Sequence, residues 1–145
     1  MILELVALLC TGLFAGAAIY VSLVEHPARL ECGPALAIAE FGPSYRRGAV
    51  MQASLAVGGC VAAVASWTQG STTPVLIAGL LLGSAVPFTL IVILPTNKRL
   101  LEAGLDRGSP EAAALLARWG RLHAVRSVVS GVAFLLLGLH RGGIL

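Results

Sequence analysis

The amino-acid sequence predicts an all-α fold, a four-helix transmembrane bundle with short cytoplasmic loop helices, forming a single integral membrane domain over residues 1–145. Hydrophobic residues make up 57% of the chain and charged residues only 12%, and the mean hydropathy is +0.90. A small soluble domain cannot hide that much apolar surface from water. Four apolar stretches are also close to the roughly 20 residues that a helix needs to cross about 30 Å of hydrocarbon. They lie at residues 2–24, 48–68, 74–95 and 122–139.

The first stretch, residues 2–24, is expected to remain in the protein as a membrane span. Its small residues Ala15-Gly16-Ala17-Ala18 are similar to a signal-peptide cleavage site. However, no basic residue precedes the apolar run, Glu4 lies within it, and the run is longer than the core of a secretory signal. The length criterion therefore favours a retained span over a cleaved signal.

Prolines and a glycine set the expected limits of a short helix in the first loop and of the start of the second span. Pro34 and residues 35–41 predict a short interfacial helix, which Gly42-Pro43-Ser44 would end while capping the second span.

In the third span, Pro87 is expected to kink the helix, and the Thr89 hydroxyl would satisfy a freed backbone carbonyl. Such a kink would open space inside the bundle.

The segment Ser109-Pro110-Glu111 predicts a helix start well before the fourth span. Serine is a favoured N-cap, proline fits the first helical position, and an acidic residue is favoured near the positive end of the helix dipole. We expect this helix to continue without a break into the fourth span. It would then bring Trp119 and His123 to the membrane surface.

Small residues recur at the four-residue spacing that lets membrane helices approach closely. The patterns are Gly12-x-x-x-Gly16, Gly79-x-x-x-Gly83 and the series Ser54, Gly58, Ala62. They predict close packing within the bundle, with a homo-oligomer contact as the alternative interpretation.

The distribution of Lys and Arg predicts the orientation in the membrane. The two long loops, together with the adjoining end of the fourth span, hold nine basic residues, whereas Arg141 alone lies on the opposite side. The positive-inside rule then predicts that the protein lies in the cell (inner) membrane with both long loops in the cytoplasm and both termini on the outer side. No dense basic tract with interleaved aromatics suggests nucleic acid as a partner. The basic residues on the loop side are Arg29, Arg46, Arg47, Lys98, Arg99, Arg107, Arg118, Arg121 and Arg126.

The three cysteines argue against disulfide exchange. Cys10 and Cys60 fall inside spans, Cys32 lies in the first loop, and no two form a Cys-x-x-Cys pair. Membrane oxidoreductases that exchange disulfides need such a pair near the surface. Cys10 and Cys60 are better interpreted as small apolar packing residues.

A polar stripe marks the candidate site. On one continuous helix, Trp119, His123, Arg126 and Ser130 are spaced i, i+4, i+7 and i+11, so they share a face. His123 and Arg126 lie at or inside the edge of an apolar span, where an ionisable group is costly without a partner or a task. These two residues therefore favour a functional interpretation.

A second set lies at the same end of the first span. Ser22, His26 and Arg29 repeat the spacing of the stripe, although Pro27 is expected to distort the turn. Glu25 has two interpretations, an ion pair with Arg29 at i+4 or a catalytic carboxylate.

Other polar residues near this end have structural alternatives. Asn97 would contact a ligand or, with Thr96, merely cap the next helix. Arg29, Tyr45 and Trp119 are also ordinary residues at a membrane boundary.

Four motifs at this end resemble the anthrone oxygenase family of small four-span membrane proteins, many of them bacterial and uncharacterised. The motifs are Glu-His-Pro-Ala-Arg (25–29), Pro-Ser-Tyr-Arg-Arg (43–47), Pro-Thr-Asn-Lys-Arg-Leu (95–100) and Arg-Trp-Gly-Arg-Leu-His-Ala-Val-Arg (118–126). Their order and spacing extend the resemblance over the whole chain. Fungal members oxidise polyketide anthrones to anthraquinones with molecular oxygen. The resemblance therefore implies an oxidoreductase, a monooxygenase acting on an activated aromatic small molecule at the cytoplasmic face.

Such chemistry needs a base, donors for a phenolate-like oxygen and flat aromatic surfaces. His123 is the candidate base, with His26 as the alternative, and Arg126 and Asn97 are the candidate stabilisers. Candidate substrate-binding residues are Trp119, Tyr45, Arg29 and Glu25. This mechanism requires no cofactor, because the deprotonated substrate can itself pass an electron to oxygen.

Two rival hypotheses remain open. In the first, His26, His123 and Glu25 bind iron, or the two histidines bind haem or copper, although Glu25 and His26 point about 100° apart on a helix. In the second, the protein is not catalytic and binds a small molecule, lipid or an assembly partner through its arginines. The expected partners otherwise are the lipid bilayer, a hydrophobic aromatic substrate and molecular oxygen.

Overall fold

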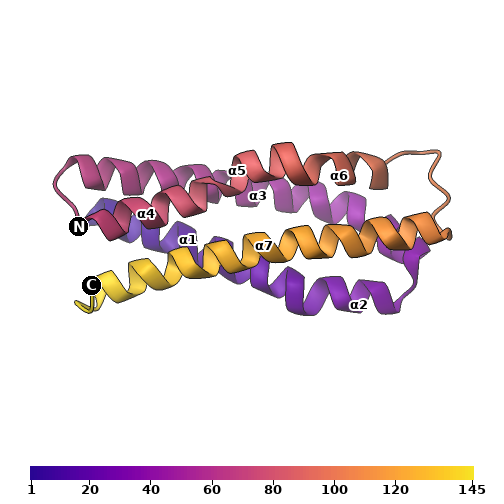
Figure 1. Ribbon diagram of the computed structural model, residues 1–145, viewed down its shortest axis with the longest axis horizontal. Coiled ribbons are helices and arrows are strands. Elements are labelled where there is room, and N and C mark those ends of the chain that lie inside the picture. The colour runs from indigo at the N-terminus through magenta and orange to yellow at the C-terminus, as the bar shows by residue number, and fades with distance from the viewer.

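A computed structural model describes residues 1–145 and confirms the all-α fold (Figure 1). Four long helical rods run up and down beside one another. Both termini lie at one end of the bundle, here called the termini end, and the connections from α2 to α3 and from α6 to α7 lie at the other, the loop end. Each rod is long and apolar enough to cross a membrane. The rods are α1 (Ile2–Tyr20), η1 (Val21–Glu25) and α2 (His26–Glu31); α3 (Pro34–Thr68); α4 (Thr73–Gly83), α5 (Ala85–Phe88), η2 (Thr89–Ile93) and α6 (Leu94–Leu100); and α7 (Pro110–Arg141).

All four rods are longer than their apolar stretches because helix continues into the loop end, and α3 and α7 extend furthest. The predicted break at Gly42-Pro43-Ser44 is wrong, since α3 runs straight through Pro43. Proline removes one backbone hydrogen bond, but buried Ile38 and Phe41 hold this part of α3 in a hydrophobic cluster. The predicted continuous fourth helix is confirmed, with the Ser109 hydroxyl oxygen accepting from the Ala112 amide at 3.2 Å.

Two π-helical turns interrupt the first and third rods, and each lies just before a proline. The His26 amide donates to the Val21 carbonyl and the Leu94 amide to the Thr89 carbonyl, five residues back in both cases. Pro27 and Pro95 follow immediately and have no amide hydrogen to continue the α-helical pattern. Each turn therefore accommodates one extra residue, and π turns of this kind are frequent at functional sites.

The third rod has a further interruption near Pro87, as predicted. The helix α4 ends at Gly83, and α5 begins after Ser84. The proline ring would clash with the carbonyl four residues earlier, at Gly83. The Thr89 hydroxyl donates to the Ala85 carbonyl at 2.7 Å, which differs from the expectation that it would satisfy the carbonyl freed by Pro87.

Small residues bring the helices together toward the termini end. A Cβ atom on Gly79 would overlap Ala63, and one on Gly83 would lie 2.7 Å from the Cys60 sulfur. A Cβ atom on Gly12 would lie 2.9 Å from the Phe134 ring. These three glycines therefore pack inside the bundle, as predicted, whereas a Cβ atom on Gly16 would meet nothing within 4 Å. The homo-oligomer remains a prediction.

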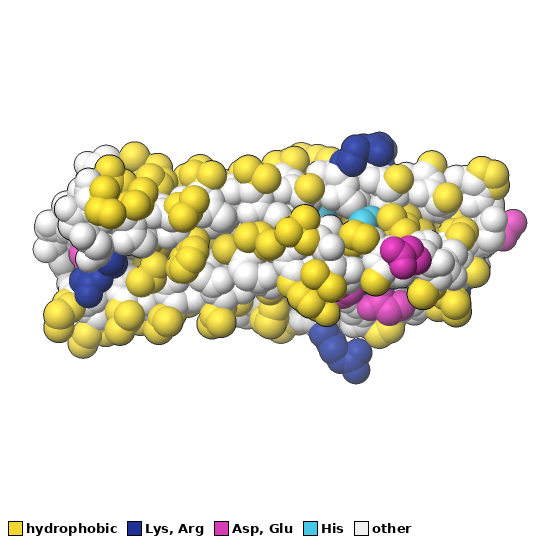
Figure 2. Space-filling view, turned by 90° about the horizontal axis from the view of Figure 1, so that it is seen from below, with side chains coloured by type: hydrophobic (Ala, Val, Ile, Leu, Met, Phe, Trp, Pro, Cys, Tyr) yellow, Lys and Arg dark blue, Asp and Glu magenta, His cyan; other side chains and the backbone are white.

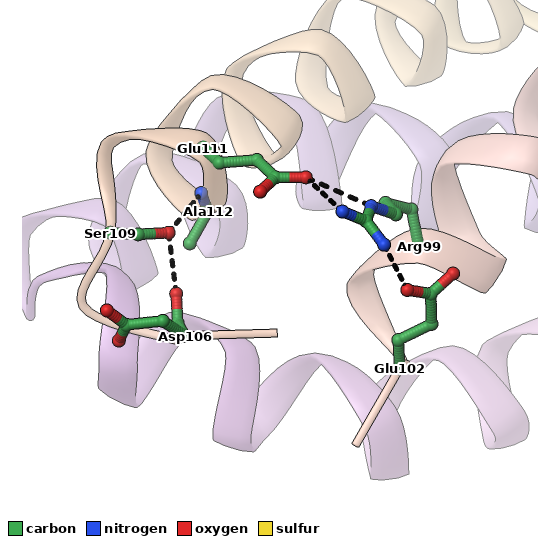
Figure 3. Close-up of polar contacts among 6 residues, drawn as sticks. All are labelled: Arg99, Glu102, Asp106, Ser109, Glu111 and Ala112. Atoms are coloured by element: carbon green, nitrogen blue, oxygen red, sulfur yellow. Dashed lines mark hydrogen bonds and ion pairs between the residues drawn. The ribbon is translucent and has the colours of Figure 1, made fainter. Parts of the chain in front are cut away.

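A salt-bridged corner closes the loop end between α6 and α7 (Figure 3). The Arg99 guanidinium binds Glu102 and also donates from Nη2 to Glu111 Oε1 at 2.7 Å. The Ser109 hydroxyl donates to the Asp106 carbonyl at 2.6 Å. Because the Arg99 ion pairs are exposed, they shape the corner more than they stabilise the fold.

The surface agrees with a membrane-spanning bundle. Figure 2 shows hydrophobic side chains along the whole body, with a stretch next to the termini end that carries no charged side chain in this view. Exposed apolar residues such as Leu23, Ile91 and Val128 lie on this surface. The protein is therefore an integral membrane protein with lipid around its middle.

Candidate functional site

A cavity of about 190 Å³ lies between the four rods in the half of the bundle nearer the loop end. Both π turns contribute to its wall, through Val21 and Glu25 of η1 and Thr89 and Leu90 of η2. The cavity is mainly apolar with a few charged and polar groups, as is usual for small-molecule sites. Its lining residues are Phe14, Val21, Glu25, Arg29, Phe41, Ser44, Tyr45, Gly48, Ala49, Gln52, Ala53, Ala56, Ala85, Val86, Thr89, Leu90, Trp119, His123 and Arg126.

Aromatic rings form one continuous wall of this cavity. Trp119 stacks on His123 with ring centroids 4.7 Å apart and an interplanar angle of 25°. Its ring also meets the edge of Phe41 at 5.3 Å, and Phe41 stacks on Tyr45 at 5.7 Å and 3°. The wall offers flat surface against which a planar aromatic ligand can stack.

His123 is the most enclosed ionisable group of the lining, with 3% of its surface exposed. Its Nδ1 atom lies 3.1 Å from Ser22 Oγ, and Ser22 Oγ lies 2.7 Å from Ser127 Oγ. The Ser127 hydroxyl donates to the Ala18 carbonyl at 2.8 Å. The imidazole is therefore held by hydrogen bonds on one side and by the Trp119 ring on its face.

Arg126 reaches the cavity without a carboxylate partner. Its Nη2 donates to the amide oxygen of Gln52 at 2.5 Å, and its Nε has no hydrogen-bond partner. The guanidinium carbon lies 5.3 Å from the centre of the Phe14 ring. Since none of the five ion pairs of the molecule includes Arg126, this cation is free to attract an anionic ligand.

Gln52 was not predicted as a partner of Arg126. Gln52 is a buried polar side chain within the apolar stretch 48–68. A polar residue in such a stretch is itself a signal of a partner or a function. The side chain that would receive it could not be named, because the two residues are 74 positions apart.

Arg29 differs from Arg126, because carboxylates already neutralise it. It binds Glu25 and also Glu40, whose Oε2 lies 2.8 Å from Arg29 Nε. The Ser44 hydroxyl donates to Glu25 Oε1 at 2.9 Å, which connects this network to α3. The predicted ion pair between Glu25 and Arg29 is thus confirmed, and it lies in the cavity wall.

Two predicted catalytic residues, His26 and Asn97, are buried but do not line the cavity. The His26 ring lies 5.1 Å from the Trp119 ring and packs against Gly120, where a Cβ atom would overlap the imidazole. Asn97 is 1% exposed, and its side-chain oxygen has no hydrogen-bond partner. His26 instead packs against Trp119 outside the cavity lining. The predicted site residues that the cavity brings together are Glu25, Arg29, Tyr45, Trp119, His123 and Arg126.

The alternative metal ligands do not come together as a set. No group of three or more His, Cys, Asp or Glu side chains is arranged to hold a metal ion. The rings of His26 and His123 both contact Trp119 instead.

Comparison with known proteins identifies the family of this chain. The family model for anthrone oxygenase matches residues 41–136, which include Tyr45, Gln52, His123 and Arg126. The chain belongs to the anthrone oxygenase family.

Two fungal anthrone oxygenases are among the relatives of this chain. The anthrone oxygenase tpcL of Aspergillus fumigatus is 35% identical over 129 residues, covering 81% of this chain and 80% of the relative. An anthrone oxygenase of Claviceps purpurea is 30% identical over 141 residues, covering 86% of this chain and 80% of the relative. No solved structure shows a significant match.

Proposed function

We propose that this protein is a membrane-embedded oxygenase that oxidises an anthrone-like aromatic molecule with molecular oxygen. The observation that carries the proposal is the arrangement around Arg126. This cation has no carboxylate partner and lines an apolar cavity together with an imidazole and an aromatic wall. That combination suits a flat, neutral molecule that becomes an anion during the reaction.

The residues of the cavity can be assigned to the steps of this reaction. His123 accepts a proton from the methylene group between the two aryl rings of the substrate. Negative charge then develops on the carbonyl oxygen, where the Arg126 guanidinium and the Gln52 amide stabilise it. Trp119 and Tyr45 hold the rings flat.

Oxygen chemistry follows on the substrate itself. The anion passes one electron to oxygen, and the two radicals combine into a hydroperoxide at the former methylene carbon after proton return. Loss of water forms the second carbonyl. The overall change is anthrone plus O₂ to anthraquinone plus H₂O, which balances without another reductant.

Access from the lipid is part of the proposal. Ala53 of α3 and Leu90 of η2 are exposed and also line the cavity, so it reaches the outer surface between these rods. Arg126 is fifteen residues from Arg141 on α7, or roughly 22 Å along the helix. With Arg141 at the membrane boundary on the termini side, Arg126 would lie within the roughly 30 Å of hydrocarbon. An apolar substrate and oxygen, both soluble in lipid, would enter sideways.

Turnover of a simple substrate tests the function. Purified protein in detergent is given 1,8-dihydroxyanthrone in air, and anthraquinone absorbance and oxygen uptake are followed against the spontaneous rate. We expect His123→Ala to lose the enzymatic rate and His140→Ala, on the same helix at the termini end, to keep it. The His123 assignment is wrong if both variants match the wild type.

A second pair of variants tests the anion site. Arg126→Met should lose turnover, whereas Arg121→Met, an exposed position on the same helix, should retain it. Metal content and the absorption spectrum of the active protein address the iron, haem or copper alternative. Binding of the anthrone without any turnover in the wild type would support the non-catalytic alternative instead.

We further propose that the loop end faces the cytoplasm of a cell whose inner membrane holds the bundle. The excess of Lys and Arg at this end supports the orientation. Cys32 is exposed at the loop end, whereas Cys10 and Cys60 lie within the spans. A membrane-impermeant maleimide should therefore label inside-out vesicles and not intact cells, with Cys32→Ser as the control. Labelling of intact cells at Cys32 would reverse the orientation.

A further inference from the structure

We propose that Ser22 and Ser127 form a one-way hydrogen-bond relay that fixes His123 as the tautomer with its proton on Nδ1. The Nε2 atom is then left with its lone pair toward the cavity. Ser22 and Ser127 are positioning residues, because neither is expected to touch the substrate. The catalytic meaning of the relay rests on the proposed function, but the tautomer itself does not.

The relay joins the first and last rods of the bundle. It runs from His123 Nδ1 to Ser22 Oγ at 3.1 Å, then to Ser127 Oγ at 2.7 Å, and ends at the Ala18 carbonyl at 2.8 Å. Ser22 lies in the π turn η1, and Ser127 lies one helical turn beyond His123 on α7. Every contact is within the range of a normal hydrogen bond.

The direction of the relay follows from counting protons at Ser127. Its hydroxyl has one proton to donate. The carbonyls of Ala18 at 2.8 Å and His123 at 3.4 Å can only accept. If the proton pointed at Ser22 instead, the Ser127 and Ala18 oxygens would face each other inside the bundle with no hydrogen between them, which is costly for buried groups.

The remaining protons are then determined. Because the proton of Ser127 goes to a carbonyl, its oxygen accepts from Ser22. The single proton of Ser22 is used in that bond, so Ser22 Oγ can only accept from His123. A neutral imidazole has one N–H, and the bond made by one ring nitrogen sets which nitrogen carries it. His123 therefore donates from Nδ1.

The free nitrogen faces the cavity. His123 belongs to the cavity lining. Its Nε2 has no hydrogen-bond partner in the protein, and it is not among the fully enclosed polar atoms that lack one. The lone pair that can accept a proton from a substrate is thus on the accessible edge of the ring.

The test reads the tautomer directly. Full-length protein labelled with ¹⁵N-histidine is placed in nanodiscs without substrate, and the His123 signals are assigned by their loss in His123→Gln. The two tautomers have different nitrogen shifts and different N–H couplings. We expect an Nδ1–H signal for His123 in the wild type. An Nε2–H signal there would overturn the proposal whatever the variants do.

Variants of Ser22 test the relay against a general structural role. Ser22→Ala should shift His123 toward the Nε2–H tautomer and lower kcat at least about tenfold with little change in KM. Ser22→Thr, which keeps the hydroxyl, should retain the wild-type tautomer, as should Ser54→Ala, whose side chain bonds only to its own helix. A wild-type tautomer in Ser22→Ala would contradict the relay.

The same measurements separate this inference from the proposed function. An Nδ1–H tautomer in a protein that does not oxidise anthrones would support the relay and refute the oxygenase. Turnover by a wild type with an Nε2–H tautomer would support the oxygenase and refute the relay.

Discussion

Replacing Gly120 with alanine tests the packing behind the cavity. A Cβ atom at this position would overlap the imidazole of His26. The ring cannot swing away freely, because His26 is 6% exposed and lies against Trp119. We therefore expect overpacking, which costs about 1–3 kcal/mol in a well-packed core.

The matched control is Gly131→Ala on the same helix. A Cβ there would lie 3.9 Å from the nearest side-chain atom, of Ile19, which is an ordinary contact. Alanine is better than glycine inside a helix by roughly 0.5–1 kcal/mol, and this gain applies to both variants. It cancels in the comparison, so Gly120→Ala should be about 1–3 kcal/mol less stable than Gly131→Ala.

Reversible unfolding by SDS in mixed micelles, followed by circular dichroism, measures both free energies. Gly120→Ala should unfold at lower SDS than the wild type, and Gly131→Ala at the same or higher SDS. Equal stability of the two variants, within about 0.5 kcal/mol, would refute the tight contact between His26 and α7.

Three further substitutions address other parts of the molecule. Gln52→Glu would give Arg126 the carboxylate that it lacks, so we expect a folded protein with reduced anthrone turnover, measured by oxygen uptake; undiminished turnover would contradict the role of the free cation. Ser109→Ala should lower the free energy of unfolding by about 1 kcal/mol through loss of the N-cap, in the same SDS titration. Arg99→Ala should unfold at nearly the same SDS concentration as the wild type, because its ion pairs are exposed, and clearly earlier unfolding would show that the corner stabilises the bundle.

The four rods were largely predictable from the sequence, but not all of their limits at the loop end. Long apolar stretches have few alternatives in lipid, because every backbone group must be paired within a helix. The Ser109 cap is likewise a local signal, and α7 begins where it predicts. The break expected at Pro43 failed because contacts of Ile38 and Phe41 with distant residues hold the helix together.

The site was predicted in part. His123, Arg126 and Trp119 stood out because a polar stripe at the edge of an apolar span is visible in one helix. Their partners, Ser22 and Gln52, come from other rods, and no spacing along the chain reveals which polar residues meet. The π turns were also hidden, since Pro27 predicted a distorted turn without specifying an extra residue, and the third span was expected to end at Pro95.

The distance along the chain between Ser22 and His123 also bears on biosynthesis. The two residues are 101 positions apart, in the first and the last rod. A growing chain with three rods inserted has both π turns, Gln52 and most of the cavity wall, but neither the His123 imidazole nor the Arg126 guanidinium. The site is therefore complete only when translation is nearly finished, and any product ending before α7 would lack both of these side chains.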